Sequence, residues 1–168
     1  DNDSASSGNC SLEFAFSGGR NGYVGYGGSN ALYLWNELNN NLIFGTNNTE
    51  RMRVDSSGRL LVGHSSSQGS NRKLQVAATD SSAGLELFRY TTSAGSAPSL
   101  TLSRSNSDTL GTNALLDSGD AVGYVQFKAA NGSAYNTAAQ IYAEVDGTPG
   151  VNDMPGRLIL ATTADGAS

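Results

Sequence analysis

Cysteine and histidine are almost absent from this sequence, each occurring once in 168 residues. The single Cys10 cannot form a disulfide framework or a thiolate metal cluster. The single His64 cannot complete a zinc centre with one cysteine, because structural zinc sites use four such ligands. A Ser-His-Asp triad would also have to be built on His64, and no nearby pattern pairs it with an acid. We interpret His64 as a loop residue.

Charge and long apolar runs are also sparse. The net charge is −5, and the carboxylates and arginines are scattered, so there is no basic patch of the kind that binds nucleic acid. No apolar run approaches the roughly 18 residues that span a bilayer, and the amino end carries no signal-peptide core. We therefore expect a chain that is not embedded in a membrane and has no nucleic-acid partner.

Large apolar residues are few, whereas small and polar residues are abundant. Leu, Ile, Val and Phe make up roughly a fifth of the chain, which is the low edge for globular proteins. Glycine alone contributes 21 residues, alongside many Ser, Asn and Thr. Such a chain can form many short strands but can bury only a thin core, so we expect it to need partners to close that core.

Short strand signals recur roughly every ten residues between Gly- and Asn-rich turns, which is typical of all-β proteins. In the segment Ala138–Val145, tyrosine, isoleucine and valine favour a strand over a helix. Outside the hairpin described next, the expected strands are Leu12–Phe16, Tyr23–Tyr26, Ala31–Trp35, Leu42–Phe44, Lys73–Val76, Leu85–Tyr90, Ser99–Ser103, Val122–Lys128, Ala138–Val145 and Arg157–Thr162. The sequence predicts an all-β fold of short antiparallel strands and hairpins.

The stretch Asn48–Gly63 predicts a β-hairpin. Met52 and Val54 alternate with charged residues, so we expect one apolar core face and one polar face. Asp55–Gly58 fits a type I turn, with Asp at the first position and Gly at the fourth. The apolar alternation resumes at Leu60 on the return strand. Nothing in this hairpin has an obvious chemical task.

Composition divides the chain into four expected parts. Residues 1–10 are polar and form a flexible leader, and residues 11–64 form a β-hairpin repeat module. The Ser-rich residues 65–72 form a linker. Residues 73–168 form a second β module, which stops before its next hairpin.

Candidate catalytic and metal-binding residues all have simpler interpretations. Glycoside hydrolysis needs two carboxylates beside a cleft, and no sequence feature shows that any two meet. Calcium loops need a D-x-D-x-D-G spacing, which the aspartates lack. The residues considered for hydrolysis are Glu13, Glu50, Glu86, Glu144 and several aspartates, and those considered for calcium are Asp117, Asp120, Asp146 and Asp153. We predict no enzymatic activity, no catalytic residue, no metal and no cofactor.

Aromatic residues cluster in the first part of the chain, at Tyr23, Tyr26, Tyr33 and Trp35. They could form a platform on which sugar rings stack, or they could be ordinary cross-strand packing pairs. The sequence leaves both interpretations open.

Two groups of motifs resemble one known family. The run Thr-Glu-Arg-Met-Arg-Val-Asp-Ser-Ser-Gly at Thr49–Gly58 resembles a motif repeated in bacteriophage tail fibre proteins, many of which end in an endosialidase-type intramolecular chaperone domain. The second module resembles a recurring module of the same proteins, which usually precedes another such hairpin, in the segments Ser118–Gly123, Ile141–Gly150, Asp153–Leu158 and Thr162–Ser168. The chaperone domain has no counterpart in this sequence, so neither autoproteolysis nor chaperoning is expected of it.

The resemblance implies an elongated homotrimeric fibre in the virion, a structural segment that extends toward the host surface and helps bind it during adsorption. Implied partners are two further copies of the chain, other tail or fibre proteins, and a host surface glycan or outer-membrane receptor. Whether strands pair within one chain or intertwine between three stays open. Two other functions also stay open: a polysaccharide-degrading tailspike (hydrolase or lyase) and a bacterial trimeric surface adhesin. Candidate receptor contacts are the loops Gly18–Gly22, Thr91–Pro98 and Asn131–Asn136.

Overall fold

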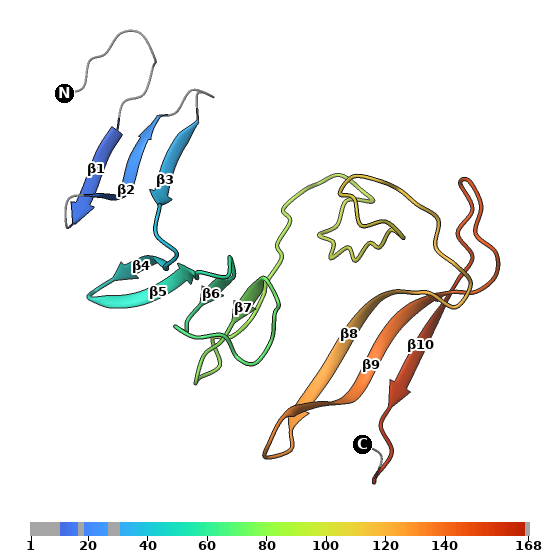
Figure 1. Ribbon diagram of the computed structural model, residues 1–168. Helices are drawn as coiled ribbons and strands as arrows, with labels where there is room; N and C mark the ends of the chain where they lie inside the picture. Colours follow the sequence, from blue (N-terminus) through green and yellow to red (C-terminus); the bar gives the residue numbers. More distant parts are fainter. Residues whose placement is uncertain (1–10, 17–18, 27–30, 167–168) are drawn as a thin grey trace. The chain divides into compact units, whose positions relative to one another are not determined.

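The computed structural model describes residues 11–16, 19–26 and 31–166, so the predicted leader and Cys10 lie outside the described residues. The described part is all-β, with ten strands in three sheets and no helix (Figure 1). The chain divides into two compact units, residues 1–86 and residues 87–168. The prediction of an all-β fold is confirmed.

The first sheet of unit 1 is antiparallel, in the order β1-β2-β3. Its strands are β1 (Ser11–Phe16), β2 (Gly19–Tyr26) and β3 (Leu32–Asn36). The strand β2 begins four residues earlier than expected, because Gly19 pairs with Phe16 and Gly22 pairs with Phe14. A Cβ added at Gly22 would lie 2.6 Å from the carbonyl oxygen of Trp35, so only glycine lets β3 approach this closely.

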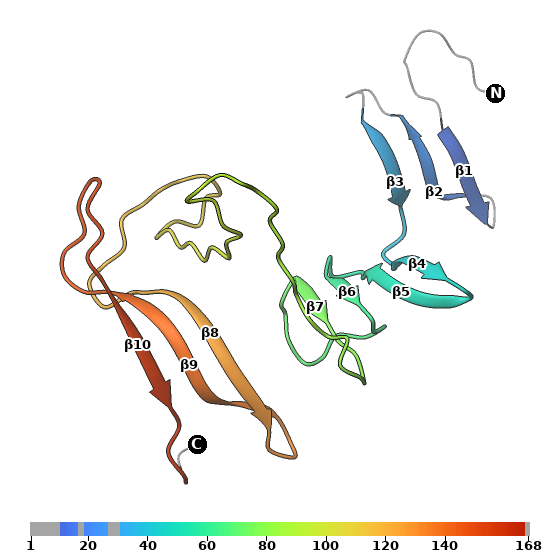
Figure 2. The same ribbon diagram turned by 180° about the vertical axis from the view of Figure 1, so that it is seen from behind.

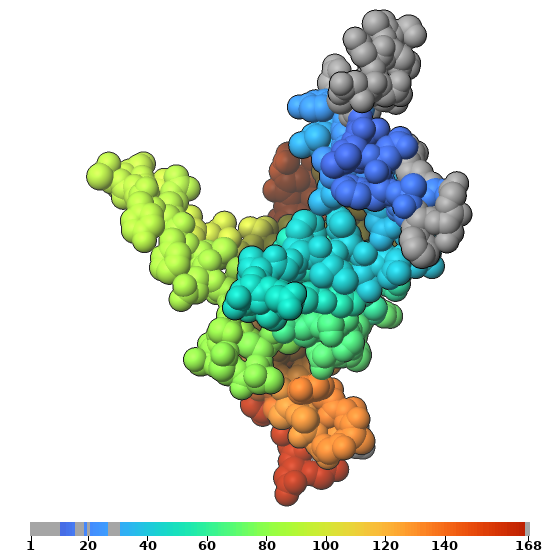
Figure 3. All heavy atoms as spheres, turned by 90° about the vertical axis from the view of Figure 1, so that its left-hand side faces the viewer, coloured from blue at the N-terminus to red at the C-terminus, as the bar shows by residue number. Residues whose placement is uncertain are grey.

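The second sheet of unit 1 has the order β4-β5-β6-β7. Its strands are β4 (Leu42–Thr46), β5 (Thr49–Val54), β6 (Leu60–Val62) and β7 (Leu74–Val76), and their atoms, cyan to green, form one continuous body in Figure 3. Asn47 and Asn48 have φ of 50° and 55°, the values of a two-residue type I′ turn between β4 and β5. The predicted hairpin is β5–β6, and its predicted turn is confirmed: the N–H of Gly58 donates to the carbonyl of Asp55 at 2.8 Å.

The Ser-rich residues 65–72, expected to link two modules, instead connect two strands of one sheet. β7 pairs in parallel with β6, and a parallel pair requires a crossover connection rather than a tight turn. The division between compact units falls later, between Glu86 and Leu87. Serine content alone did not distinguish a crossover within a sheet from a linker between units.

Unit 2 contains one antiparallel sheet in the order β10-β9-β8 (Figure 2). Its strands are β8 (Ala121–Ala130), β9 (Tyr135–Val145) and β10 (Gly156–Thr162). The side-chain oxygen of Asn131 accepts hydrogen bonds from the N–H groups of Ser133 and Ala134, and Gly132 has φ of 96°, so the turn expected here is confirmed. The expectation of a strand rather than a helix at Ala138–Val145 is also confirmed.

Two expected strands, Leu85–Tyr90 and Ser99–Ser103, are absent from the structure. Both segments are irregular, and neither joins any of the three sheets (Figure 1). A strand requires a partner backbone, and these segments find none among the described residues of the same chain. The prediction is wrong for the single chain.

The core of each unit is small. Among the described residues the buried hydrophobic side chains are Leu61, Leu116 and Val145, and no polar residue is buried. The sequence-based expectation of a thin core is therefore confirmed.

Candidate functional site

The hairpin turn is held by the carboxylate of Asp55. Its Oδ1 accepts hydrogen bonds from the backbone N–H groups of Ser57 at 2.9 Å and Arg59 at 3.0 Å, and its Oδ2 accepts one from Arg59 Nε at 2.7 Å. Three hydrogen bonds hold the pKa of the Asp55 carboxyl below its usual value. The backbone N–H of Arg59 contributes most, followed by the guanidinium of Arg59 and the N–H of Ser57. Within the motif Thr49–Gly58, the side chain of Asp55 therefore stabilises the turn between β5 and β6.

Acid is expected to weaken this turn. Because the pKa of Asp55 is lower in the folded chain than the value of about 3.9 in the unfolded chain, its contribution to stability is complete above about pH 4 and is lost as pH falls through the folded-state pKa. Asp55→Asn keeps an oxygen for the backbone N–H groups but loses the ion pair with Arg59. We expect this variant to be less stable at pH 7 and to lose less stability on acidification, as measured by urea unfolding midpoints at pH 7, 4 and 2.5. Equal losses in both proteins would contradict this role of Asp55.

The two faces of the hairpin are not buried as expected. Val54 is 38% exposed and Met52 is half-buried, whereas Leu61 on the opposite face is 0% exposed. The prediction that Met52 and Val54 form the core is therefore wrong for the single chain. The available signal was the unbroken apolar run Leu60–Val62, which is typical of a strand covered on both faces.

The crossover residues 63–73 explain why Leu61 is buried. Leu61 pairs across the sheet with Gln75, whose side-chain nitrogen donates to Ser67 Oγ and to the carbonyls of Ser70 and Arg72. The N–H of Gln68 donates to the side-chain oxygen of Gln75 at 3.0 Å. These bonds hold the crossover around Gln75 on the Leu61 face.

His64 belongs to the same crossover. Its Nδ1 lies 2.7 Å from the carbonyl oxygen of Ser66, and its Nε2 lies 3.4 Å from that of Gln75. Both contacts are with backbone carbonyls, which fits the interpretation of His64 as a loop residue.

The four glutamates considered for glycoside hydrolysis lie in four different elements. Glu13 is in β1, Glu50 in β5 and Glu144 in β9, and Glu86 lies in an irregular segment. Arg53 donates two side-chain hydrogen bonds to Glu50, and these bonds lower the pKa of that carboxyl. A general acid requires the opposite shift.

The aspartates considered for calcium are engaged in local contacts. Asp120 accepts hydrogen bonds from the N–H of Asp117 at 3.0 Å and from the side chain of Arg104 at 3.2 Å. The carboxylate of Asp146 lies 3.5 Å from the guanidinium of Arg157, and the backbone of Asp153 pairs with that of Gly150. No group of three His, Cys, Asp or Glu side chains arranged to hold a metal occurs among the described residues.

Three of the four clustered aromatic residues lie on one face of the first sheet. Tyr23 pairs with Trp35 across β2 and β3, and Tyr33 lies on the same face. The ring centroid of Tyr33 is 6.4 Å from that of Tyr23 and 6.2 Å from that of Trp35. Tyr26 pairs with Leu32 and lies on the opposite face, so it is not part of the row. Tyr23 and Tyr33 contact each other across β2 and β3, whereas Tyr33 and Trp35 are two residues apart on β3, so the contacts are those of aromatic packing within one sheet face.

The three loops considered as receptor contacts are placed differently. Gly18 lies outside the described residues, and Gly19–Gly22 belong to β2 rather than to a loop. Thr91–Pro98 is a loop, with a turn in which the N–H of Ser96 donates to the carbonyl of Ser93. The third loop is shorter than expected, because Tyr135 and Asn136 already belong to β9.

The largest feature available for an interaction is a set of one-sided apolar faces. In each sheet, paired residues and every second residue along a strand share a face, so the strand registers identify the apolar residues that lie together. The apolar face of the first sheet contains Leu12, Phe14, Val24, Tyr26, Leu32 and Leu34. That of the second contains Leu42, Phe44, Met52, Val54, Leu60, Val62, Leu74 and Val76. That of the third contains Val125, Phe127, Ile141, Ala143, Leu158 and Leu160. We call these the three apolar faces.

Solvent reaches each of the three apolar faces. Leu12 in the first sheet is 65% exposed, Leu74 in the second is 57% exposed and Leu160 in the third is 74% exposed. Scattered exposed leucines are common in proteins, but continuous apolar faces on every sheet indicate an interaction surface. Strand alternation predicts these faces, whereas the membership of each face required the registers.

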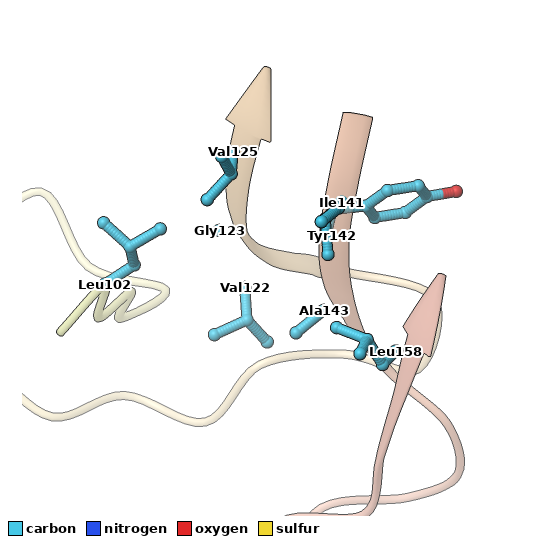
Figure 4. A pocket seen from close by; sticks show the side chains of 8 residues that line it. All are labelled: Leu102, Val122, Gly123, Val125, Ile141, Tyr142, Ala143 and Leu158. Atoms are coloured by element: carbon cyan, nitrogen blue, oxygen red, sulfur yellow. The ribbon is translucent and has the colours of Figure 1, made fainter. Parts of the chain in front are cut away.

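The third apolar face contains a cavity of about 180 Å³ (Figure 4). Its walls are apolar side chains from β8, β9 and β10, closed on one side by Leu102 from the irregular segment. Leu102 fits there because position 123 is glycine: a Cβ at Gly123 would lie 2.9 Å from the Cβ of Leu102. The apolar lining suits apolar side chains. Tyr142 is the one lining residue with a titratable group, and its ring points away from the cavity toward the opposite face of the sheet (Figure 4).

Within the described residues, no helix is long and apolar enough to cross a membrane. A comparison with models of known protein families gives no match, and a search of curated proteins gives none.

Proposed function

We propose that this chain is a structural segment of a bacteriophage tail fibre, in which three copies associate into a homotrimer that extends toward the bacterial surface and helps bind it. The observation that carries the proposal is the set of three apolar faces, each exposed in the single chain. A stable soluble protein requires those faces to be covered, and a second copy of the same chain offers matching ones.

The number of copies comes from the resemblance of Thr49–Gly58 to the tail-fibre motif. A sheet with an exposed apolar face suits that number, because three copies around a common axis can turn that face inward. The Tyr124–Tyr142 stack and the Glu144–Arg157 ion pair lie on the polar face of the third sheet. This face then points outward.

Host binding by such a fibre depends on repeated weak contacts rather than on one deep pocket. Three copies of each exposed loop, on several fibres per virion, raise the effective concentration of the second and third contacts once the first has formed. The loop Thr91–Pro98 and the turn at residues 131–134 are the proposed contacts. The surface partner is a host glycan or an outer-membrane receptor.

Labelling of intact particles tests the assignment to a tail fibre. An antibody raised against the purified chain is expected to decorate the tail fibres of the phage that encodes it in negative-stain electron microscopy. Antibody preincubated with free chain provides the control. Labelling of a bacterial cell surface with none on virions would overturn the proposal in favour of an adhesin.

A further inference from the structure

The segment Leu87–Ser103 of unit 2 has the sequence of paired strands but lacks their hydrogen bonds. Among the described residues, the one backbone–backbone bond within it joins Ser96 to Ser93. No other backbone N–H or C=O group of the two expected strands has a backbone partner among the described residues. Irregular structure over so many consecutive residues is unusual in a compact unit.

The side chains of this segment are too apolar for a solvated loop. Leu87 is 47% exposed, Phe88 71% and Tyr90 92%, and Leu100 and Leu102 are 67% and 47% exposed. Apolar side chains at both 87 and 88 would occupy opposite faces of a strand, which is typical of a strand covered on both sides. The sequence of the segment is therefore typical of a buried strand, whereas in the single chain its apolar side chains are exposed.

The end of the segment is fixed beside the third apolar face. Leu102 packs over Gly123 (Figure 4). Arg104 donates to the carbonyl of Ala121 at 2.8 Å and to Asp120 at 3.2 Å. These contacts hold the segment next to the start of β8, whose outer edge pairs with no other strand of the sheet. The segment is thus located where the apolar faces of neighbouring copies meet in the proposed trimer.

We infer that Leu87–Tyr90 and Ser99–Ser103 become β-strands by pairing with the backbone of a neighbouring copy of this chain, so that the three chains intertwine in unit 2. This inference rests on the proposed homotrimer. The occupant is a second copy because the segment is anchored beside the third apolar face, and in the proposed trimer a neighbouring copy brings the unpaired outer edge of its own β8 to that face.

Hydrogen exchange of the assembled full chain tests the pairing directly. Amides of residues 87–90 and 99–103 are expected to exchange roughly 100-fold or more slowly than unprotected amides, as in paired strands. The exposed stretch Ala164–Gly166 serves as the internal reference for free exchange. Exchange of both segments at the reference rate in a sedimenting trimer would overturn the inference.

A matched pair of proline variants gives an independent readout. Thr101→Pro removes an N–H from the middle of the second segment, so we expect the thermal midpoint of the trimer to fall by about 5–10 °C. Ala94→Pro occupies the second position of the Ser93–Ser96 turn, where Gly95 follows with φ of 81°, and proline suits this position of a type II turn. This control is expected to change the midpoint by less than about 2 °C.

The outcomes separate the two proposals. Equal midpoints for both proline variants, with free exchange in a trimer, would overturn the intertwining and leave the trimer intact. A folded chain that sediments as a monomer would overturn both. Slow exchange together with a selective loss in Thr101→Pro supports both.

Discussion

Replacing Leu160 by aspartate is expected to break the trimer, although Leu160 is 74% exposed in the single chain. A substitution at such a position normally changes stability by less than about 0.5 kcal/mol. If the third apolar face lies inside the trimer, the new carboxylate is instead buried without a partner, at a cost of about 3–5 kcal/mol per chain. Sedimentation velocity at micromolar concentration is expected to show loss of the trimer in favour of smaller or aggregated species.

The polar face of the same sheet provides the control for Leu160→Asp. Gln126 is exposed and hydrogen-bonds to Gln140 on that face, so Gln126→Asp introduces the same charge where the proposed trimer leaves water. We expect this variant to sediment as the parent protein does. Trimers of equal stability for both variants would show that the apolar face of the third sheet is not an interface.

The second large effect is expected at Gly63, where the hairpin meets its crossover. Gly63 has φ of 80°, and a Cβ there would lie 2.2 Å from the carbonyl oxygen of Ala77. Gly63→Ala must therefore accept both an unfavourable backbone conformation and a displacement of the chain after β7. The two costs together are about 2–5 kcal/mol, measurable as a lower midpoint in urea or thermal unfolding.

Gly69 separates the two costs. It has φ of 69°, but a Cβ there would meet nothing within 4 Å, so Gly69→Ala carries the backbone cost alone, about 1–2 kcal/mol. A loss in Gly63→Ala no larger than that in Gly69→Ala would show that the close approach to Ala77 does not contribute.

Local patterns predicted the elements of this fold better than their partners. The Asp55–Gly58 turn was predictable because its conformation is determined by four residues and by the side chain of Asp55. The segment Val122–Lys128 was likewise predicted correctly as a strand. These features depend on neighbours in the sequence.

Features that depend on distant partners were not predictable. The parallel pairing of β6 with β7 turned the expected Ser-rich linker into a crossover and buried Leu61 instead of Val54. The strand-like composition of Leu85–Tyr90 does not show whether a partner strand exists. Among the described residues of one chain, this segment has no partner strand. The candidate interaction surface was hidden for the same reason, because face membership follows from register.

Sedimentation equilibrium of the unmodified chain, combined with circular dichroism, tests whether the chain is a trimer. We expect a β-rich species with three times the chain mass of 17.3 kDa, persisting on dilution to nanomolar concentration as an obligate assembly does. A β-rich, cooperatively unfolding species of 17.3 kDa would contradict it, because the three apolar faces would then be stable in water without a partner.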